Sequence, residues 1–380
     1  MARVLVTGGT GFLGARLVTR LLRTTDDTVT ILDQASAMPN FERLTRRLAD
    51  VPDLDKRLSM LEGDIAQKGL GLDRPADAEV IWNFAAIYRL EVGREIAEKV
   101  NVHGTENMLD FAAGCPSLKV FNHVSTCYVS GKRRGRIFEE ELDEGQEFNN
   151  WYEETKFRSE VLVRKRMKEM PVRTFRPAVV VGDSRTGEAA KYDGIYFFAE
   201  VLNRPLFGCK ALGTSFPIIP GDGENHVNAV PVDFLIDAMA AIGAKDETIG
   251  KTFQLADPAP LTVNGMVETL SNALGVKPSR MHLPYKLCNF AFRYAFAGKL
   301  LGLQFSLKPP FVSVHEILKQ LIPYCDHRGD YDTSNTAEAL EGTGVKCPRF
   351  DEYVHVIIGH WLEDTGRQGP GRTTEGSGRT

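Results

Sequence analysis

The sequence predicts an α/β fold, in which a doubly wound parallel sheet is followed by a smaller, mainly helical C-terminal lobe. Seven short β-rich runs alternate with helical patterns up to about residue 255, and a glycine cluster directly follows the first run. Such alternation indicates βαβ units, whose parallel strands are buried on both faces. The runs are Val4–Val6, Val29–Leu32, Leu58–Leu61, Val80–Phe84, Val120–Val124, Val172–Val181 and Thr252–Leu255.

Composition and charge narrow the class of protein. Of the 380 residues, 43% are hydrophobic and 25% charged, and the formal net charge is -4. These values are typical of a globular protein and lack the basic excess of a nucleic-acid-binding surface, so we expect no nucleic-acid partner. The six cysteines form no close pair of the kind that binds zinc or cycles as a disulfide, and we expect no metal.

Two further features bear on location. No apolar stretch approaches the roughly 18 residues that a membrane-spanning helix needs. Met1 is followed almost at once by the first β-rich run, which leaves no room for a signal peptide. We therefore expect a cytoplasmic protein with no transmembrane segment.

The chain is expected to divide at about residue 255. Residues 1–255 form the sheet domain, with an insertion at about 183–230 where the sequence becomes aromatic and loop-rich. Residues 256–364 form the smaller lobe, which includes a predicted helix over 263–274. Residues 365–380 contain almost nothing apolar and cannot offset the entropy of ordering, so a disordered tail is predicted.

A glycine motif marks the expected cofactor site. The segment TGGTGFLG (7–14) follows the first β-rich run and precedes a predicted helix over 15–23. In a Rossmann dinucleotide-binding domain, Gly8 permits the tight turn, Gly11 lets the backbone approach the pyrophosphate, and Gly14 allows close helix packing. The helix N-terminus then holds the phosphates. The other motif residues expected to contact the cofactor are Thr10, Phe12 and Leu13.

Asp33 indicates which nicotinamide cofactor binds. It ends the second β-rich run about 20 residues after the last glycine, where a carboxylate accepts hydrogen bonds from the ribose hydroxyls. A carboxylate repels the 2′-phosphate of NADP(H), and the next residue, Gln34, offers no cation for it. The sequence therefore favours NAD(H) over NADP(H). Further expected contacts are Asp64 and Ile65 beside the adenine, Ala85 and Ala86 along the cofactor, and Pro177 and Val179 beside the nicotinamide carboxamide.

The predicted catalytic residues are Tyr152 and Lys156, which are four residues apart and so share one face of a helix. The ammonium charge favours the phenolate, which suits Tyr152 to act as acid or base. Thr126, at the end of the fifth run, is the expected donor to the substrate carbonyl. Ser125 is the fallback, and a strand-end cap is the alternative role for this pair.

We expect hydride to reach the carbonyl carbon in the reductive direction while Tyr152 protonates the oxygen. Lys156 is also expected to hydrogen-bond the nicotinamide ribose. Asn101, on the helix before the fifth run, either holds the active-site backbone or a water, or caps its helix.

At these residues the chain resembles the extended short-chain dehydrogenases/reductases. The strand-end Asp33 and the segments TGGTGFLG, NFAA, VNVHGTEN, HVSTCYV, WYEETK and FRPAVVVG occur in that family's order, over roughly residues 2 to 255. Four segments look like the thioester-reductase and fatty-acyl-reductase branch: FERL (41–44), GDIAQKGLGL (63–72), AAIY (85–88) and VVVGDSRTGE (179–188).

This narrower resemblance implies long-chain acyl thioesters or aldehydes as substrates. The residues expected near such a substrate are Tyr88, Tyr128, Arg185 and Tyr192. The chain departs from that branch in two ways. Asp33 and Gln34 stand where NADPH-using acyl reductases usually carry a basic residue, and no carrier-protein or adenylation domain is attached, which implies a free-standing enzyme.

The stretch 283–324 is apolar, aromatic and weakly basic. It suits a lid over an apolar substrate, a peripheral membrane contact, or core of the lobe or a dimer contact, and we expect a homodimer. Its aromatic and basic residues include Phe290, Phe292, Tyr294, Phe296, Phe305, Phe311, Lys286, Arg293, Lys299 and Lys308.

The leading hypothesis is an NAD(P)-dependent oxidoreductase that transfers hydride to or from a carbonyl or alcohol carbon of a hydrophobic substrate. A hydroxysteroid-type dehydrogenase fits the apolar lobe as well, whereas a sugar-nucleotide epimerase or dehydratase needs a polar, phosphate-binding lobe. A non-catalytic cofactor-binding regulatory module usually lacks the tyrosine or the lysine. The acidic run 139–144 is expected to be a solvated loop.

Overall fold

The computed structural model describes residues 1–72, 77–88, 92–203, 218–288 and 324–367. The chain forms two compact units. The first unit comprises Met1–Ala178, Val232–Ala256 and Tyr331–Cys347, and the second comprises Val179–Pro231, Asp257–Asp330 and Pro348–Thr380. Both units are therefore assembled from segments that are distant in the sequence.

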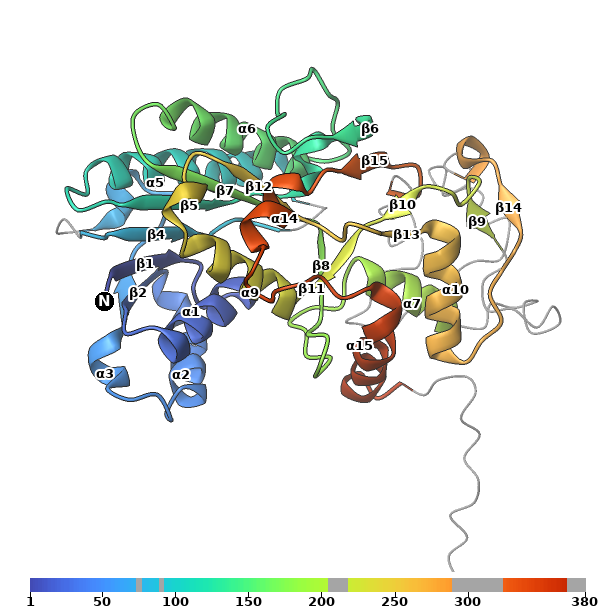
Figure 1. The fold of residues 1–380 in the computed structure, drawn as a ribbon, viewed down its shortest axis with the longest axis horizontal. Coiled ribbons are helices and arrows are strands. Elements are labelled where there is room, and N and C mark those ends of the chain that lie inside the picture. Colours follow the sequence, from blue (N-terminus) through green and yellow to red (C-terminus); the bar gives the residue numbers. More distant parts are fainter. Residues whose placement is uncertain (73–76, 89–91, 204–217, 289–323, 368–380) are drawn as a thin grey trace, which may run out of the picture. The chain divides into compact units, whose positions relative to one another are not determined.

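The first unit contains a seven-stranded sheet in the order β3-β2-β1-β4-β5-β7-β12 (Figure 1). All neighbouring strands in it run parallel, and the order reverses between β1 and β4. This topology confirms the predicted doubly wound Rossmann fold. Its strands are β1 (Arg3–Thr7), β2 (Thr28–Asp33), β3 (Leu58–Glu62), β4 (Val80–Asn83), β5 (Val120–Val124), β7 (Val172–Pro177) and β12 (Thr252–Leu255).

Helices cover both faces of this sheet. In Figure 1, α5 and α6 lie on one side, and α1 and α9 lie on the other. The unit also holds strand β6 (Arg134–Ile137), short helical turns at 35–37, 68–71, 127–130 and 246–248, and a π-helical turn, Glu98–His103. Its α-helices are α1 (Phe12–Thr24), α2 (Met38–Arg47), α3 (Leu54–Arg57), α4 (Arg94–Ala97), α5 (Gly104–Ala113), α6 (Trp151–Arg166), α9 (Val232–Gly243) and α14 (Ser334–Leu340).

Burial of the strands follows from their place in the sheet. All five residues of β5 are buried, as are the last four of β1, because helices pack on both faces of the sheet. The polar side chains of β5 make contacts inside the unit: Arg173 on β7 donates to Asn122 Oδ1 at 2.7 Å, and His123 Nδ1 lies 3.4 Å from Asn83 Nδ2. One core cluster joins the sheet to α5 and α6 through residues such as Leu5, Ile81, Met108, Phe121 and Val163.

Some predicted boundaries need correction. The first helix begins at Phe12, three residues before the predicted start, so it takes in the end of the glycine motif. The single predicted run 172–181 is two strands, and the second, β8 (Val179–Val181), belongs to the other unit. The helix predicted over 263–274 has those bounds in the structure.

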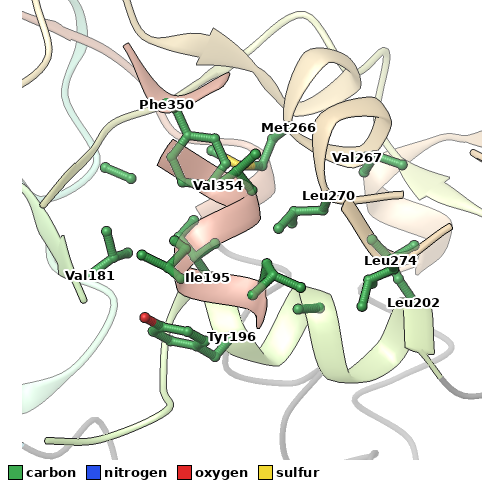
Figure 2. Packing of buried hydrophobic residues seen from close by; sticks show 14 of the residues in the cluster. Val181, Ile195, Tyr196, Leu202, Met266, Val267, Leu270, Leu274, Phe350 and Val354 are labelled. Atoms are coloured by element: carbon green, nitrogen blue, oxygen red, sulfur yellow. The ribbon is translucent and has the colours of Figure 1, made fainter. Parts of the chain in front are cut away.

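The second unit has its own core, in which α7, α10 and α15 pack together (Figure 2). Ile195 and Leu202 of α7, Leu270 of α10, and Phe350 and Val354 of α15 are nearly or fully buried in it. Besides β8, its elements are α7 (Ile195–Asn203), β9 (Ile219–Pro220), β10 (His226–Val227), β11 (Ala229–Pro231), β13 (Leu261–Thr262), α10 (Val263–Leu274), β14 (His282–Leu283) and α15 (Phe350–Asp364).

The acidic run 139–144 is only in part the solvated loop that we expected, because Glu140, Asp143 and Glu144 are exposed but Glu139 is not. Glu139 is fully buried, and its carboxylate accepts hydrogen bonds from the backbone of Gln254 at 2.7 Å and from the hydroxyl of Thr336 at 2.8 Å. The backbone N–H of Asn335 also donates to it. Burial raises the pKa of Glu139 to about 7, while these hydrogen bonds act to lower it. Glu139 therefore lies in the packed interior, while the exposed acidic residues of the run remain in contact with solvent.

These contacts also correct the expected domain division. The stretch predicted as one lobe, 256–364, is interrupted because the segment Tyr331–Cys347 returns to the first unit. Gln254 Nε2 donates to the carbonyl oxygen of Asp332 at 3.0 Å, and Asn335 Nδ2 donates to that of Thr252 at 3.1 Å. We call this segment the returning segment. Strand β15 (Arg328–Tyr331) ends at Tyr331, which is the first residue of the returning segment.

Several predictions lie outside the described residues. These are the lid, membrane or dimer roles of the 289–323 portion of the aromatic stretch, and the disorder of 368–380. Within the described ranges, no helix combines the length and the apolar character that crossing a membrane requires.

Candidate active site

The site forms where the strand order reverses, at the carboxyl ends of β1 and β4. Thr7 Oγ1 lies 2.8 Å from Asn83 Oδ1 and accepts the backbone N–H of Ala85 at 3.1 Å. A Cβ on Gly8 would lie 3.2 Å from the backbone of Ala85. The loops after the two strands therefore touch, and in doubly wound sheets such a crevice binds the ligand.

The glycine turn has the geometry that a pyrophosphate site needs. Gly8 has a φ of +63°, and its carbonyl accepts the N–H of Gly11 at 3.0 Å. A Cβ on Gly14 would lie 2.3 Å from the Gly8 carbonyl oxygen, so no side chain fits there. Among the described residues, no side chain caps α1 at Gly11. The turn and the helix N-terminus thus fit a dinucleotide.

Asp33 is held in place at the end of β2. Thr10 Oγ1 donates to Asp33 Oδ2 at 2.6 Å, and the backbone N–H of Gln34 donates to Oδ1 at 3.0 Å. The glycine loop and the acidic residue are therefore joined directly. A carboxylate fixed in this way can still accept hydrogen bonds from two ribose hydroxyls.

The two predicted adenine contacts have different environments. The Asp64 carboxylate accepts the N–H of Ala66 at 2.8 Å, which makes a local turn after β3. The side chain of Ile65 is buried in the core of the unit, against Gly104. Contact with a cofactor through the Ile65 side chain would therefore require opening the core, whereas its backbone lies in the turn.

Lys156 lies one helical turn after Tyr152 on α6 and is buried. Its ammonium group donates to the carbonyl oxygen of Val124, the last residue of β5, at 2.7 Å. Burial lowers the pKa of Lys156 to about 8, although the Glu160 carboxylate acts to raise it. The ring of Tyr88 packs edge-on against that of Tyr152, with centroids 5.0 Å apart. The predicted pair thus lies at the carboxyl edge of the sheet.

The start of α6 is fixed by two caps. Asn150 is the N-cap, and its Oδ1 accepts the N–H of Glu153 at 3.0 Å. The Glu153 carboxylate accepts the N–H of Asn149 at 2.9 Å. Because Tyr152 is the second residue of the helix, these caps fix the backbone position of Tyr152.

We expect Asn150→Ala to lower both stability and turnover. Loss of the cap should lower the free energy of unfolding by about 1 kcal/mol. It should also lower kcat several-fold, since the first turn carries Tyr152. Thr262→Ala is the matched control, because Thr262 caps α10 in the second unit through Gly265 N at 3.1 Å. Equal losses of kcat in both variants would contradict the assigned role of Asn150.

Thr126 occupies the cap position that we considered as its alternative role. Its hydroxyl accepts the N–H of Tyr128 and donates to the Pro177 carbonyl oxygen, both at 3.3 Å. The hydroxyl of Ser125 is buried and contacts the Glu160 carboxylate, whose pKa it helps to lower. Both hydroxyls lie at the end of β5. A direct role of Thr126 toward substrate stays a prediction.

A buried ion pair behind the site was missed by the sequence reasoning. Arg176 on β7 and Glu160 on α6 are each at most 1% exposed and are joined by three contacts of 2.6 to 3.1 Å. Burial acts to raise the pKa of Glu160, but Arg176 brings it down to about 2. The available signal was Arg176 itself, since a charge inside an apolar strand requires a partner.

Asn101 holds the backbone just before Tyr88, which is consistent with the first of its predicted roles. It is buried in the π-helical turn, and its Oδ1 accepts the N–H of Ile87 at 2.8 Å. Its Nδ2 donates to Thr155 Oγ1 on α6 at 3.0 Å. The residue thus ties the segment before Tyr88 to the helix of Tyr152.

The structure divides the predicted substrate residues between the units. Tyr88, which is 43% exposed, and Tyr128 belong to the first unit. Arg185 and Tyr192 belong to the second, where the Tyr192 hydroxyl donates to Asp364 Oδ2 at 2.8 Å. Pro177 and Val179 also fall on opposite sides of the division. In the described part of the chain, no cluster of His, Cys, Asp and Glu could hold a metal ion.

Residues 6–239 match the model of an NAD-binding family described as male sterility protein. A linear gramicidin synthase from Brevibacillus parabrevis is 27% identical over 384 residues, which cover 96% of this chain and 7% of that protein. Fatty acyl-CoA reductase wat of Drosophila melanogaster is 24% identical over 282 residues, which cover 63% of this chain and 53% of that protein. The chain thus spans less than two thirds of each relative.

Solved structures share the fold. The terminal R domain from the myxalamid PKS-NRPS biosynthetic pathway superposes with a TM-score of 0.77 at 24% identity, over 97% of this chain and 92% of that chain. A dTDP-glucose 4,6-dehydratase from Streptomyces venezuelae, with NAD and TYD bound, superposes with a TM-score of 0.61 at 22% identity. The match covers 97% of this chain and 99% of that chain. At these identities the likeness shows the fold alone.

Proposed function

The chain belongs to the NAD-binding male sterility protein family, and on this basis we propose that it is an NAD(H)-dependent reductase of hydrophobic acyl thioesters or aldehydes. Membership of that family, with the fatty acyl-CoA reductase relative and the shared R-domain fold, confirms the predicted resemblance to the extended short-chain dehydrogenases/reductases.

One observation carries the proposal. Tyr152 and Lys156 share one helix face at the carboxyl edge of a doubly wound sheet, and Lys156 is bonded to the end of the strand that leads to Thr126. The glycine turn at the same edge fits a dinucleotide. A proton donor beside a nicotinamide site is the arrangement that carbonyl reduction needs.

In the mechanism that we propose, the glycine turn and Asp33 would hold the nicotinamide cofactor, which would supply hydride to the substrate carbonyl carbon. Tyr152 donates its phenolic proton to the carbonyl oxygen as negative charge develops there, which completes the reduction of an aldehyde to an alcohol. A thioester gives a hemithioacetal in this step; its C–S bond then breaks, the hydroxyl proton passes to the sulfur, and the thiol leaves the aldehyde behind. Lys156 stabilises the phenolate that remains and would hydrogen-bond the cofactor ribose. Thr126 exchanges its bond to the Pro177 carbonyl for one to the substrate oxygen, which orients the carbonyl toward Tyr152.

The apolar substrate class has two supports. A relative that matches 63% of the chain is named a fatty acyl-CoA reductase. Exposed aromatic side chains also adjoin the catalytic helix: Tyr88 contacts Tyr152, and Trp151 begins the helix at 36% exposure. Such side chains present apolar surface to a hydrophobic ligand.

The test is turnover by the purified chain with NADH and NADPH, followed at 340 nm on long-chain acyl thioesters, fatty aldehydes, ketosteroids and a sugar nucleotide. Oxidation of NADH with an acyl thioester or aldehyde is the expected result. Turnover confined to the ketosteroids would assign a hydroxysteroid-type dehydrogenase. Conversion confined to the sugar nucleotide would assign an epimerase or dehydratase; because such a reaction regenerates its cofactor, it is detected by chromatography of the products and not at 340 nm. Failure to bind either cofactor would refute the proposal.

Cofactor preference should follow Asp33. We expect the double variant Asp33→Ala/Gln34→Arg to shift the ratio of NADH to NADPH affinity at least tenfold toward NADPH, because a carboxylate on the ribose is replaced by a cation for its phosphate. Fluorescence titration with both cofactors measures the shift. Glu62→Gln is the matched control, since Glu62 ends β3 opposite Asp33. An unchanged ratio in the double variant would refute the assignment to NADH.

A further inference from the structure

Tyr331, the first residue of the returning segment, packs against the turn that carries Thr126. Its ring lies edge-on to that of Tyr128, with centroids 6.3 Å apart and planes at 75°. Its hydroxyl lies 3.4 Å from Ser130 Oγ. It also packs against the buried cluster formed by Cys127, Ala178 and Ala256. One side chain therefore packs against the turn Cys127–Ser130.

The turn is also fixed by β7. The Cys127 thiol donates to the Arg176 carbonyl oxygen at 3.0 Å, and Thr126 donates to that of Pro177 at 3.3 Å. The turn is thus held by the end of β7 and by Tyr331, and Gln146 Nε2 donates to its Val129 carbonyl at 2.7 Å. If Tyr331 is removed, the other contacts remain and the space of its ring is left empty.

The neighbouring part of the returning segment is strongly anchored. The N–H of Asp332 donates to the Ile137 carbonyl at 2.9 Å, and Thr336 donates to the fully buried Glu139 at 2.8 Å. Arg136 pairs with the Asp332 carboxylate, which is 5% exposed on its side chain. The position of Tyr331 is therefore set by buried polar contacts, as precise placement of a supporting residue requires.

We propose that Tyr331 is a positioning residue of the active site, which acts on turnover by holding Thr126 and Tyr128 in place. The consequence for catalysis rests on the proposed reductase function. Removing the ring leaves a cavity beside Cys127, which is 1% exposed, and the turn relaxes toward it. A displacement of about 1 Å at a group that orients the substrate costs on the order of 100-fold in rate.

The experiment compares Tyr331→Ala and Tyr331→Phe with Asn335→Ala as the matched control. Asn335 lies in the same segment and donates to the Thr252 carbonyl, on a different strand from the turn. Three properties are measured: kcat and KM on the best substrate of the panel, NADH affinity by fluorescence, and thermal midpoint. The rate at which a thiol reagent labels Cys127 in the native protein is measured by peptide mass spectrometry.

Tyr331→Ala should lower kcat roughly 10- to 100-fold while NADH affinity changes less than twofold. Tyr331→Phe keeps the ring and should retain most of the activity. Cys127 labelling should accelerate at least tenfold in Tyr331→Ala alone, because burial keeps this thiol protonated and covered in the wild type. Asn335→Ala should lower the thermal midpoint without changing kcat or labelling.

Wild-type kcat in a folded Tyr331→Ala would overturn the inference, and so would an equal loss of kcat in Asn335→Ala. The labelling measurement is independent of the proposed function. If the wild type turns over nothing in the panel, the reductase proposal fails, yet unchanged labelling of Cys127 in Tyr331→Ala would separately show that Tyr331 does not hold the turn.

Discussion

Tyr152→Phe is expected to lose at least 1,000-fold in kcat, with about the wild-type affinity for NADH. The substitution removes the phenolic proton and keeps the ring, which packs edge-on against Tyr88. The caps at Asn150 and Glu153 are unaffected, so α6 should begin at the same place. Stopped-flow or steady-state oxidation of NADH, together with a fluorescence titration, measures both quantities.

The control for this variant is Tyr88→Phe, which changes the other ring of the same edge-on pair. It should keep kcat within a few-fold, because the ring contact is conserved and no catalytic proton is removed. If Tyr152→Phe turned over at the wild-type rate, a different acid would have to protonate the substrate oxygen, and the assigned chemistry would fail.

Lys156→Met should lower kcat by about 100- to 10,000-fold and, unlike Tyr152→Phe, should also weaken NADH binding about tenfold. Lys156 is expected both to stabilise the phenolate and to hydrogen-bond the ribose, so its loss removes two interactions. Methionine has nearly the same length and suits the buried site. Normal NADH affinity in Lys156→Met would contradict the ribose contact.

The pH dependence of the wild type tests the charge of the same lysine. With its pKa lowered to about 8 by burial, Lys156 is protonated below pH 8 and loses its charge above it. The reductive kcat should therefore fall as the pH rises through 8. Titration of His123 on β5 does not contribute to this fall in kcat, because burial lowers the pKa of His123 to about 3. The residual kcat of Lys156→Met should not show this fall as the pH rises through 8.

Much of the fold of the first unit could be predicted, because its strands, glycine turn and catalytic helix are each determined by residues close together in the sequence. Each of the seven strands lies in a short β-rich run, and such runs alternating with helices are typical of a parallel sheet covered on both faces. The glycine turn could be predicted from its motif as well, since Gly14 has no space for a Cβ and Gly8 adopts a positive φ. The placement of Tyr152 and Lys156 on one face of α6 could be predicted from their spacing, because residues four apart share a helix face.

The parts that were missed depend on partners distant in the sequence. Glu139 reads as one of several acidic residues, and its burial depends on Thr336, 197 positions away. Nothing in the local pattern of the returning segment shows that it joins the first unit. The division of the run 172–181 was hidden as well, because Ala178 alone separates the two strands.

The discontinuity of the first unit has a consequence for how the chain folds. During synthesis, all seven strands have been made once residue 255 has emerged, yet Gln254 and the Glu139 carboxylate then still lack partners at 332–336. The last contacts of the nucleotide-binding half must wait for about 80 more residues, and closing such long loops is slow. Ribosome-bound chains that stop near residue 256 should therefore remain sensitive to protease until the returning segment has been made.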